Sequence, residues 1–336
     1  MRTRARGVAL AGLIVALAGC SNDDNPTTPT PYSGPPLLLA FASDRPPSQL
    51  FANDIWFADL STGEAPFAPP NVNSTSDEGP MGLSGDGRTM AFSSSRILLG
   101  SLSGFALMDV ATGQLSLPFR TRQFNGPQNP SLSYDGRYLA TNYQVGGDPF
   151  AQVVAVEDLA ADTLLTLASL NDLGFTNFDP SINGDATLIA YATNGTHSVG
   201  AFDIVLYSVP RDSFIDLPGL NSNQQELGPA ISADGRYIAF TSGRPGGAGL
   251  IDVYVYDRQT SSLLDLPGLN TEFSEVQPCL SPDGRYLACT TESEGSADVR
   301  LYDIIAKHVV AMPGVNHPRN VDQYPVLSSR PPTIAR

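Results

Sequence analysis

One phrase recurs along the whole chain at an almost constant interval. Its clearest copies are "LSYDGRYLA", "ISADGRYIA" and "LSPDGRYLA", which begin at residues 132, 231 and 280, and looser copies begin at 83 and 182. The aspartates of the five copies are spaced 49, 50, 49 and 49 residues apart. Such regular spacing is typical of a repeat architecture and excludes a set of unrelated domains.

Each repeat predicts four short β-strands. In the last copy these are "PCLS", "RYLACT", "DVRLYD" and "HVVAMP", bounded by Gly, Pro, Asp and Ser. The run "DVYVYD" at 252–257 places valines on one face and tyrosines on the other, so neither face is polar. Four-stranded antiparallel sheets stacked face to face around an axis bury both faces. The sequence therefore predicts an all-β chain folded as a β-propeller.

The two ends of the chain predict the number of blades. A second and a third strand of a first blade are recognisable at 37–44 and 53–63, but no first strand precedes them. The segment "YPVLSS" at 324–329 matches the first strands of the other repeats. We therefore expect a six-bladed β-propeller closed by the C-terminal strand.

The repeat resembles a known family of propeller units. Its pattern is P-x-h-S-x-D-G-R-x-h-A-F-x-S followed by D-h-Y-h-h-D, where h is hydrophobic. This resembles the TolB-like, WD40-like (PD40-type) repeats, and it is also similar to the propeller repeats of prolyl-oligopeptidase-type peptidases. The resemblance implies a six-bladed TolB-like β-propeller over residues 36–330. It implies little about function, because such propellers serve many tasks.

The N-terminal residues predict export and a lipid anchor. Three arginines precede an apolar run over 8–18 that is too short to span a bilayer, and "LAGC" follows, ending at Cys20. This arrangement resembles the lipobox of bacterial lipoproteins. We expect a lipoprotein signal peptide at 1–19 and lipid attachment at Cys20, with an ordinary secretory signal as the alternative.

The next segment predicts a tether. Residues 20–35 are polar and proline-rich, a composition that cannot form a core, so we expect a lipidated N-terminus followed by a disordered linker. A lipid anchor would place the protein in the cell envelope. Ser21 after the lipid-bearing cysteine favours the outer membrane, with the propeller facing the periplasm or the cell surface.

The charge of the chain limits its partners. The formal net charge is -15, and removal of the three signal-peptide arginines takes it to about -18. So acidic a surface repels nucleic acid and anionic lipid headgroups. The membrane is therefore expected to be reached through the N-terminal lipid alone, and the partner is expected to be an envelope protein or a cell-surface polymer.

Two features of the repeat are expected to have structural roles, not catalytic ones. The Asp-Gly pair suits a tight hairpin turn, because Asp accepts from nearby backbone donors and Gly adopts positive φ. A proline precedes each first strand, as in Pro229 and Pro278, and is expected at the first position of the strand, where it loses no ladder bond. Five copies of a catalytic carboxylate, one per blade, would make no chemical sense.

Two sets of polar residues border the loops from second to third strands. By family resemblance these loops open on the usual binding face of a propeller. The two sets could form ion pairs within or between blades, or a ring of polar groups around the channel mouth. They are Arg45, Arg96, Arg244, Asp54, Asp203, Asp252 and Asp298.

The connections between blades lead to the same face. Asn221, Asn270 and Asn316 in their repeated "PGLN" or "PGVN" segments are expected to hold local turns. The variable residues that follow these asparagines are candidates for ligand contact, because loops on a rigid scaffold carry recognition.

Other chemistry has little support in the sequence. Cys279 and Cys289 lie ten residues apart across one hairpin, so they predict either a disulfide or two buried thiols. No zinc-spaced ligand set, phosphate loop or G-x-S-x-G segment occurs, and the histidines are His197, His308 and His317. No cofactor is therefore expected.

We expect a non-catalytic scaffold that binds a protein or a polymer at the cell envelope. One alternative is a propeller enzyme, a glycan lyase or lactonase-type hydrolase that uses a metal held by carboxylates. A third alternative is capture of a small ligand or cation in the central channel. A tightly bound divalent ion that is lost when Asp252 or Asp298 is replaced would favour the enzyme.

Overall fold

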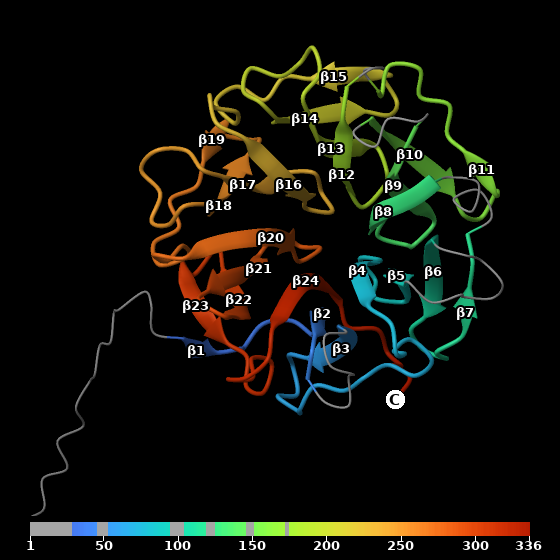
Figure 1. Ribbon diagram of the computed structural model, residues 1–336, viewed down its shortest axis with the longest axis vertical. Helices are drawn as coiled ribbons and strands as arrows, with labels where there is room; N and C mark the ends of the chain where they lie inside the picture. The colour runs from blue at the N-terminus through green and yellow to red at the C-terminus, as the bar shows by residue number, and fades with distance from the viewer. Residues whose placement is uncertain (1–28, 46–52, 95–103, 119–124, 146–150, 172–174) are drawn as a thin grey trace, which may run out of the picture.

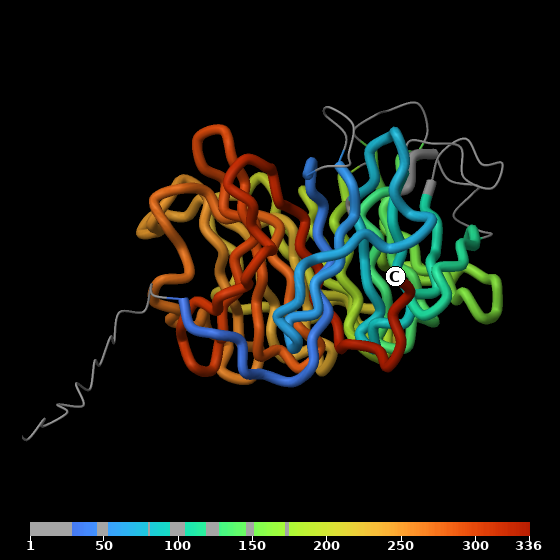
Figure 2. Tube along the Cα trace, turned by 90° about the horizontal axis from the view of Figure 1, so that it is seen from below, coloured from blue at the N-terminus to red at the C-terminus, as the bar shows by residue number. Residues whose placement is uncertain are grey.

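Six small sheets surround a central axis in the computed structural model, which describes residues 29–45, 53–94, 104–118, 125–145, 151–171 and 175–336 (Figure 1). Seen from the side, the sheets stand next to one another as a short cylinder (Figure 2). Within these ranges, no helix is long and apolar enough to cross a membrane. The predicted all-β, six-bladed propeller is confirmed.

Each of blades two to six is built from four strands that are consecutive in sequence. The first of the four lies next to the axis and the fourth lies outermost. Blade two is β4 (Glu78–Leu83), β5 (Thr89–Ser94), β6 (Gly104–Asp109) and β7 (Leu115–Ser116), and blade three is β8 (Asn125–Leu132), β9 (Tyr138–Gln144), β10 (Gln152–Asp158) and β11 (Thr163–Leu164). Blade four is β12 (Asn177–Ile182), β13 (Leu188–Thr193), β14 (Asp203–Ser208) and β15 (Ser213–Ile215). Blade five is β16 (Glu226–Ile231), β17 (Tyr237–Ser242), β18 (Asp252–Asp257) and β19 (Ser262–Leu263), and blade six is β20 (Ser274–Leu280), β21 (Tyr286–Ser293), β22 (Ser296–Asp303) and β23 (His308–Ala311).

Blade one is built from both ends of the propeller. Its innermost strand is β24 (Asp322–Ser329), which pairs antiparallel with β2 (Leu37–Ser43), and β3 (Asp54–Asp59) follows outward. Leu37 lies opposite Ser329, and Ser43 lies opposite Asp322. The predicted closure of the ring by the C-terminal strand is therefore confirmed.

The repeated phrase forms the turn between the first and second strands of a blade. In blade six, the Ser281 hydroxyl and the Arg285 N–H both donate to Asp283 Oδ1, at 2.5 and 3.1 Å, and the Tyr286 N–H donates to Ser281 Oγ at 2.9 Å. Gly284 has a φ of 69°, in the left-handed region that glycine adopts without strain. The aspartate thus organises a turn.

Backbone hydrogen bonds join the turns of neighbouring blades. The N–H donors and their acceptor carbonyls are Ser329 and Gly85, Asp86 and Tyr134, Tyr134 and Gly184, Gly184 and Ala233, and Ala233 and Pro282, at 2.9 to 3.2 Å. Pro282 is the corresponding residue of blade six, and proline has no N–H. Pro282 therefore cannot extend the series from blade six to blade one.

The prolines of the first strands lie inside the strands, at β-bulges. In β12, Phe178 faces Ala192 and Ser181 faces Ala190, so that Asp179 and Pro180 together oppose one residue. A bulge leaves one N–H out of the ladder, which is why a proline is tolerated there. The prediction of a proline at the first position of each strand is therefore wrong.

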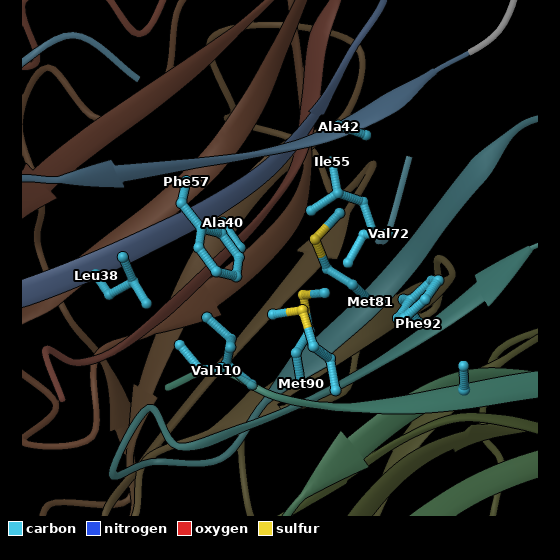
Figure 3. Close-up of a cluster of buried hydrophobic side chains, with 13 residues drawn as sticks. Leu38, Ala40, Ala42, Ile55, Phe57, Val72, Met81, Met90, Phe92 and Val110 are labelled. Carbon is cyan, nitrogen blue, oxygen red and sulfur yellow. The ribbon is translucent and has the colours of Figure 1, made fainter. Parts of the chain in front are cut away.

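Each boundary between neighbouring blades contains its own hydrophobic cluster. Between blades one and two, Leu38 and Phe57 pack near Met81, Met90 and Phe92 (Figure 3). Because these sheets are covered on both sides, most residues of their second and third strands are buried, as in β17 and β18. Apolar burial of this kind contributes about 25 cal/mol per Å² and supports the ring.

A short segment before blade one lies along blade six. In this segment β1 (Thr30–Pro31) pairs in parallel with β23, and the ring of Tyr32 lies 5.2 Å from that of Tyr286. The sequence places these residues in the disordered tether 20–35, whereas the structure has them on the propeller. The reason is the open edge of β23 and an aromatic surface next to it, which composition does not reveal. Cys20 and the signal peptide lie outside the described residues.

Candidate binding face

One face of the propeller carries the loops from second to third strands of blades four, five and six and the described parts of the connections between blades (Figure 2). It lies opposite the Asp-Gly turns. The loop of one blade accepts a backbone hydrogen bond from the first strand of the next blade at 2.9 to 3.0 Å. The described donor and acceptor pairs are Glu78 with Asn53, Glu226 with Phe202, and Glu275 with Ile251.

In blades one, three, four, five and six, an asparagine fixes the connection that follows the blade to the third strand of that blade. The Val253 N–H donates to Asn270 Oδ1 at 3.0 Å, and Asn270 Nδ2 donates to Val253 O at 2.9 Å. The same two-way contact joins Asn73 to Ile55, Asn171 to Val154, Asn221 to Ile204 and Asn316 to Val299. The asparagines therefore make contacts 17 or 18 residues away in sequence, not the local turns expected from the sequence.

Arg244 lies beneath this face. Its Nη2 donates to Glu226 Oε1 at 3.0 Å and to Leu220 O at 2.7 Å. The guanidinium lies between two aromatic rings, 5.1 Å from the centre of Phe240 and 4.8 Å from that of Tyr254. Because its side chain is 13% exposed and that of Glu226 is fully buried, the pair holds the blade together and is little available to a ligand.

Arg45 has the same surroundings in blade one. Its Nη2 donates to Asp322 Oδ1 at 2.5 Å and to Val315 O, and the guanidinium lies 4.9 Å from the ring centre of Phe41 and 5.3 Å from that of Trp56. The predicted residue Arg96 lies outside the described residues. The two described arginines thus form ion pairs within a blade.

The predicted aspartates do not pair with these arginines. Asp203 Oδ2 accepts from Ser198 Oγ and from the Gly200 N–H, both at 3.0 Å. Asp252 Oδ1 accepts from the Gly249 N–H at 3.0 Å. Asp54 and Asp298, the other two, begin or lie within the third strands of blades one and six. In blades four and five, the aspartate therefore shapes the loop that precedes it.

The sequence-based predictions missed the buried acids near the start of the first strands, Glu78, Glu226, Glu275 and Asp322. Of these, Glu226 pairs with Arg244 and Asp322 pairs with Arg45. A hydroxyl residue four positions before each glutamate donates to it at 2.6 Å, and this recurring spacing is the signal that could have revealed the set. The pairs are Ser74 with Glu78, Ser222 with Glu226, and Thr271 with Glu275.

Acids also face one another across blade boundaries. Burial, and then the nearby Glu78 carboxylate, raises the pKa of Asp54 to about 6. Burial, and then the nearby Asp322 carboxylate, raises the pKa of Asp298, and burial raises the pKa of Glu275. Oδ1 of Asp54 has no hydrogen-bond donor in the described part of the chain. These carboxyl groups are therefore easier to protonate than exposed ones.

Large apolar side chains are exposed on this face over blades four to six. Leu250 is 86% exposed and Val199 is 76% exposed, each in a loop from a second to a third strand. Ile251 and Phe273 are also exposed and come from a loop and a connection that meet at the boundary of blades five and six. Phe273 is one of the variable residues that follow Asn270, whereas the sequence pattern does not point to Leu250, Ile251 or Val199. Exposed apolar groups concentrated on one face mark an interaction surface.

Two of the three histidines make contacts within the described part of the fold. His197 stacks on Phe214 at 4.1 Å between ring centres, and the backbone N–H of His317 donates to Asp322 Oδ2. Within the ranges that the structure describes, no three His, Cys, Asp or Glu side chains are grouped as metal ligands.

The two cysteines are free thiols in the structure. Cys279 lies opposite Ala288 in the ladder, so Cys289, the next residue, points to the other face of the sheet. Cys279 accordingly packs toward blade one and Cys289 toward blade five. Of the two alternatives left by the sequence, the structure has free thiols and not the disulfide, with Cys289 buried and Cys279 half-buried.

Comparison with known proteins supports the fold. No protein-family model matches the chain, and no curated protein matches its sequence. Among solved structures, TolB from Acinetobacter baumannii is 19% identical, with a TM-score of 0.65 over 87% of this chain and 67% of that one. A TolB-type protein of Agrobacterium tumefaciens is 15% identical, with a TM-score of 0.55 over 89% of this chain and 100% of that one. The chain therefore has a TolB-like propeller fold, as predicted.

The same fold also occurs in a protein named for an enzymatic activity. Hydrazine synthase of Kuenenia stuttgartiensis is 13% identical, with a TM-score of 0.61 over 89% of this chain and 48% of that one. At these identities the likeness concerns the fold, which does not by itself decide between binding and catalysis.

Proposed function

We propose that the protein is a cell-envelope lipoprotein, anchored through Cys20, whose propeller is a non-catalytic scaffold for another envelope protein. The TolB-like fold is consistent with a binding role at most, so the proposal depends on the face that the loops form. The apolar side chains exposed over blades four to six carry it.

The exposed side chains are held on rigid loops. Leu250 and Ile251 belong to a loop anchored by the Gly249 N–H on Asp252 and by the Glu275 N–H on Ile251 O. A loop fixed at its end loses little conformational entropy on binding, which favours affinity. Val199 stands in the equivalent loop of blade four, held by hydrogen bonds to Asp203.

The charge of the molecule indicates the kind of partner. Glu272, Glu292 and Glu294 are exposed on the same side of blade six, and the whole chain carries a formal charge of -15. A partner with an apolar contact surface and basic residues around it would be complementary to this face. A neutral cell-surface polymer would satisfy the apolar part alone.

In-cell photo-crosslinking followed by mass spectrometry tests the binding face. A photoreactive residue at Leu250 is expected to capture one defined envelope protein. The matched control is the same residue at Ile305, which is 66% exposed in the turn between β22 and β23, on the opposite side. Equal capture from both positions, or attachment to polymer alone from Leu250, would contradict a protein-binding face.

Membrane fractionation tests the anchor separately. The Cys20→Ser variant is expected to move from the membrane fraction to the soluble fraction, because it lacks the sulfur that would carry the lipid. Unchanged fractionation would show that the anchoring proposal is wrong, and it would leave the crosslinking result to stand independently.

A further inference from the structure

The axis of the propeller contains a cavity of about 420 Å³ that the first strands of the blades line. Its wall combines leucine, isoleucine, valine and proline side chains with polar groups, among them Asn129, Ser181 and Gln277, and the apolar part is the larger. Among the described residues that line it, Asp179 is the one charged side chain, and none is Lys, Arg or His. The cavity therefore contains a negative charge that no basic side chain of its wall balances.

The β-bulges fix the polar groups of this wall. The residue before each inner-strand proline has positive φ, and the six are Gly79, Asn129, Asp179, Gly228, Gln277 and Tyr324. Four of the six are not glycine, and a non-glycine residue held at positive φ costs of order 1–3 kcal/mol. Backbone conformations of this kind cluster at ligand sites, which directs attention to the side chains that they orient.

Asp179 is held from both neighbouring blades. Asn129 Nδ2 of blade three donates to its Oδ1, and the backbone N–H of Gly228 in blade five also donates to the carboxylate. Both donors are neutral, so they orient the carboxylate without cancelling its charge. Burial raises the pKa of Asp179 to about 6, so that the group is largely ionised at neutral pH.

The lining selects the class of cation. A calcium ion takes six to eight oxygen ligands, usually from several carboxylates, whereas the described lining holds the single carboxylate of Asp179. An alkylammonium ion instead needs one carboxylate for its charged end and an apolar wall for its body. Leu132, Ile182, Ile231 and Leu280 supply that wall. We propose that the central channel binds a small organic ammonium ion through Asp179.

This site differs from the exposed apolar side chains over blades four to six that are proposed to bind a protein, and the two sites can be tested separately. The ammonium group could belong to a free amine or to a lysine side chain of a peptide. Calorimetry with hexylammonium, and separately with a short peptide containing one lysine, distinguishes these sources. Hexanol, which has the same apolar body and no charge, is the ligand control.

Hexylammonium or the lysine peptide is expected to bind at pH 7.5 at least about tenfold more tightly than hexanol, because a hydrogen bond to a charged group contributes more than a neutral one. Asp179→Asn is expected to weaken binding about tenfold or more. Glu272→Gln, at an exposed acid outside the channel, is expected to leave the affinity unchanged. Binding that is equal in Asp179→Asn, or absent for both ammonium probes, would overturn the proposal.

The pH dependence of the unaltered protein provides a second test that requires no folded variant. Affinity is expected to fall about tenfold between pH 7.5 and pH 5 as the carboxyl group takes up a proton, since alkylammonium ions stay charged throughout. The other titratable side chains of the lining are Tyr134, Tyr324 and Cys279, and burial raises the pKa of Cys279 to about 12, above this range. On the flanking strand β16, Glu226 is paired with Arg244. Affinity that does not change with pH would contradict a role for Asp179.

Discussion

Blades one and five contain the same arrangement of side chains but are connected differently. In blade five, Arg244, Glu226, Phe240 and Tyr254 come from one continuous segment. In blade one, Arg45 binds Asp322 from the other end of the propeller, 277 residues away in sequence. The pair, the aromatic rings and the carbonyl acceptors are nevertheless equivalent.

A second ion pair repeats the comparison on the opposite face. In blade five, Arg236 of the Asp-Gly-Arg phrase binds Asp257 at the end of the third strand, at 2.7 Å. Blade one has no such phrase, and Arg330 of the C-terminal segment binds Asp59 instead. The repeat therefore specifies its contacts through side chains, and chain continuity within a blade is not required.

Deletion of residues 321–336 is expected to have the largest effect. It removes β24 and Arg330 and exposes the inner edge of β2, so that blade one loses the strand that closes the ring. We expect loss of a single cooperative transition in thermal unfolding followed by circular dichroism. A truncated protein that melts like the full chain would show that closure contributes nothing to the fold.

Replacement of the buried arginines tests whether the two blades are equally strong. Arg244→Met and Arg45→Met each leave a buried carboxylate without its cation, which costs about 3–5 kcal/mol of unfolding free energy. Urea denaturation measures both. Arg319→Met, at an exposed position in a connection, is expected to change stability by no more than about 0.5 kcal/mol. If Arg45→Met lowers the unfolding free energy markedly less than Arg244→Met does, the ion pair of blade one stabilises the protein less than that of blade five.

Asp54 of blade one and Asp252 of blade five are expected to affect the pH dependence of stability differently. The pKa of Asp54 is raised to about 6, above the value of about 3.9 in an unfolded chain. Its contribution to stability is therefore fully present below about pH 4 and is lost as the pH rises through 6. Asp54→Asn should remove this change, worth about 2–3 kcal/mol, from the pH profile of unfolding. Asp252→Asn, which removes an acid that has a backbone donor, should leave it in place.

The ion pairs on the Asp-Gly face should have the smallest effect. Asp59→Asn and Asp257→Asn remove the partners of Arg330 and Arg236, which are partly exposed, and each should cost about 1 kcal/mol or less. Hydrogen bonding from Arg236 lowers the pKa of Asp257, so its contribution is present at neutral pH and is lost as the pH falls below about 4. Equal losses of unfolding free energy in Asp59→Asn and Asp257→Asn at pH 7 would support equivalent ion pairs in blades one and five. A loss in Asp257→Asn alone would contradict that equivalence.

The sequence predicted the features that repeat locally. The spacing of the Asp-Gly turns and the match of "YPVLSS" to other first strands led to six blades and their closure, because both depend on patterns within a few residues. The partners of Arg45 and Arg244 could not be assigned in the same way. They depend on which residues of the first strand meet the end of the second strand, and a bulge shifts that register.

Single-residue register also explains the other differences. Whether Cys279 and Cys289 share a face is decided by one position in the ladder, which strand patterns do not fix. The exposure of Leu250 and the pairing of Thr30 with Val310 are properties of loops and edges, where alternation of apolar and polar residues carries no information.

The proline at position 282 has a mechanical consequence. Among the described turns, the series of backbone hydrogen bonds ends at this residue, so the boundary between blades six and one is joined through β24, side chains and the segment around Tyr32. The chain enters the propeller at this same boundary, where β1 lies on β23 and then leads into blade one. A pulling force transmitted through the N-terminal segment would therefore act first on the junction where the described turns lack a turn-to-turn backbone hydrogen bond.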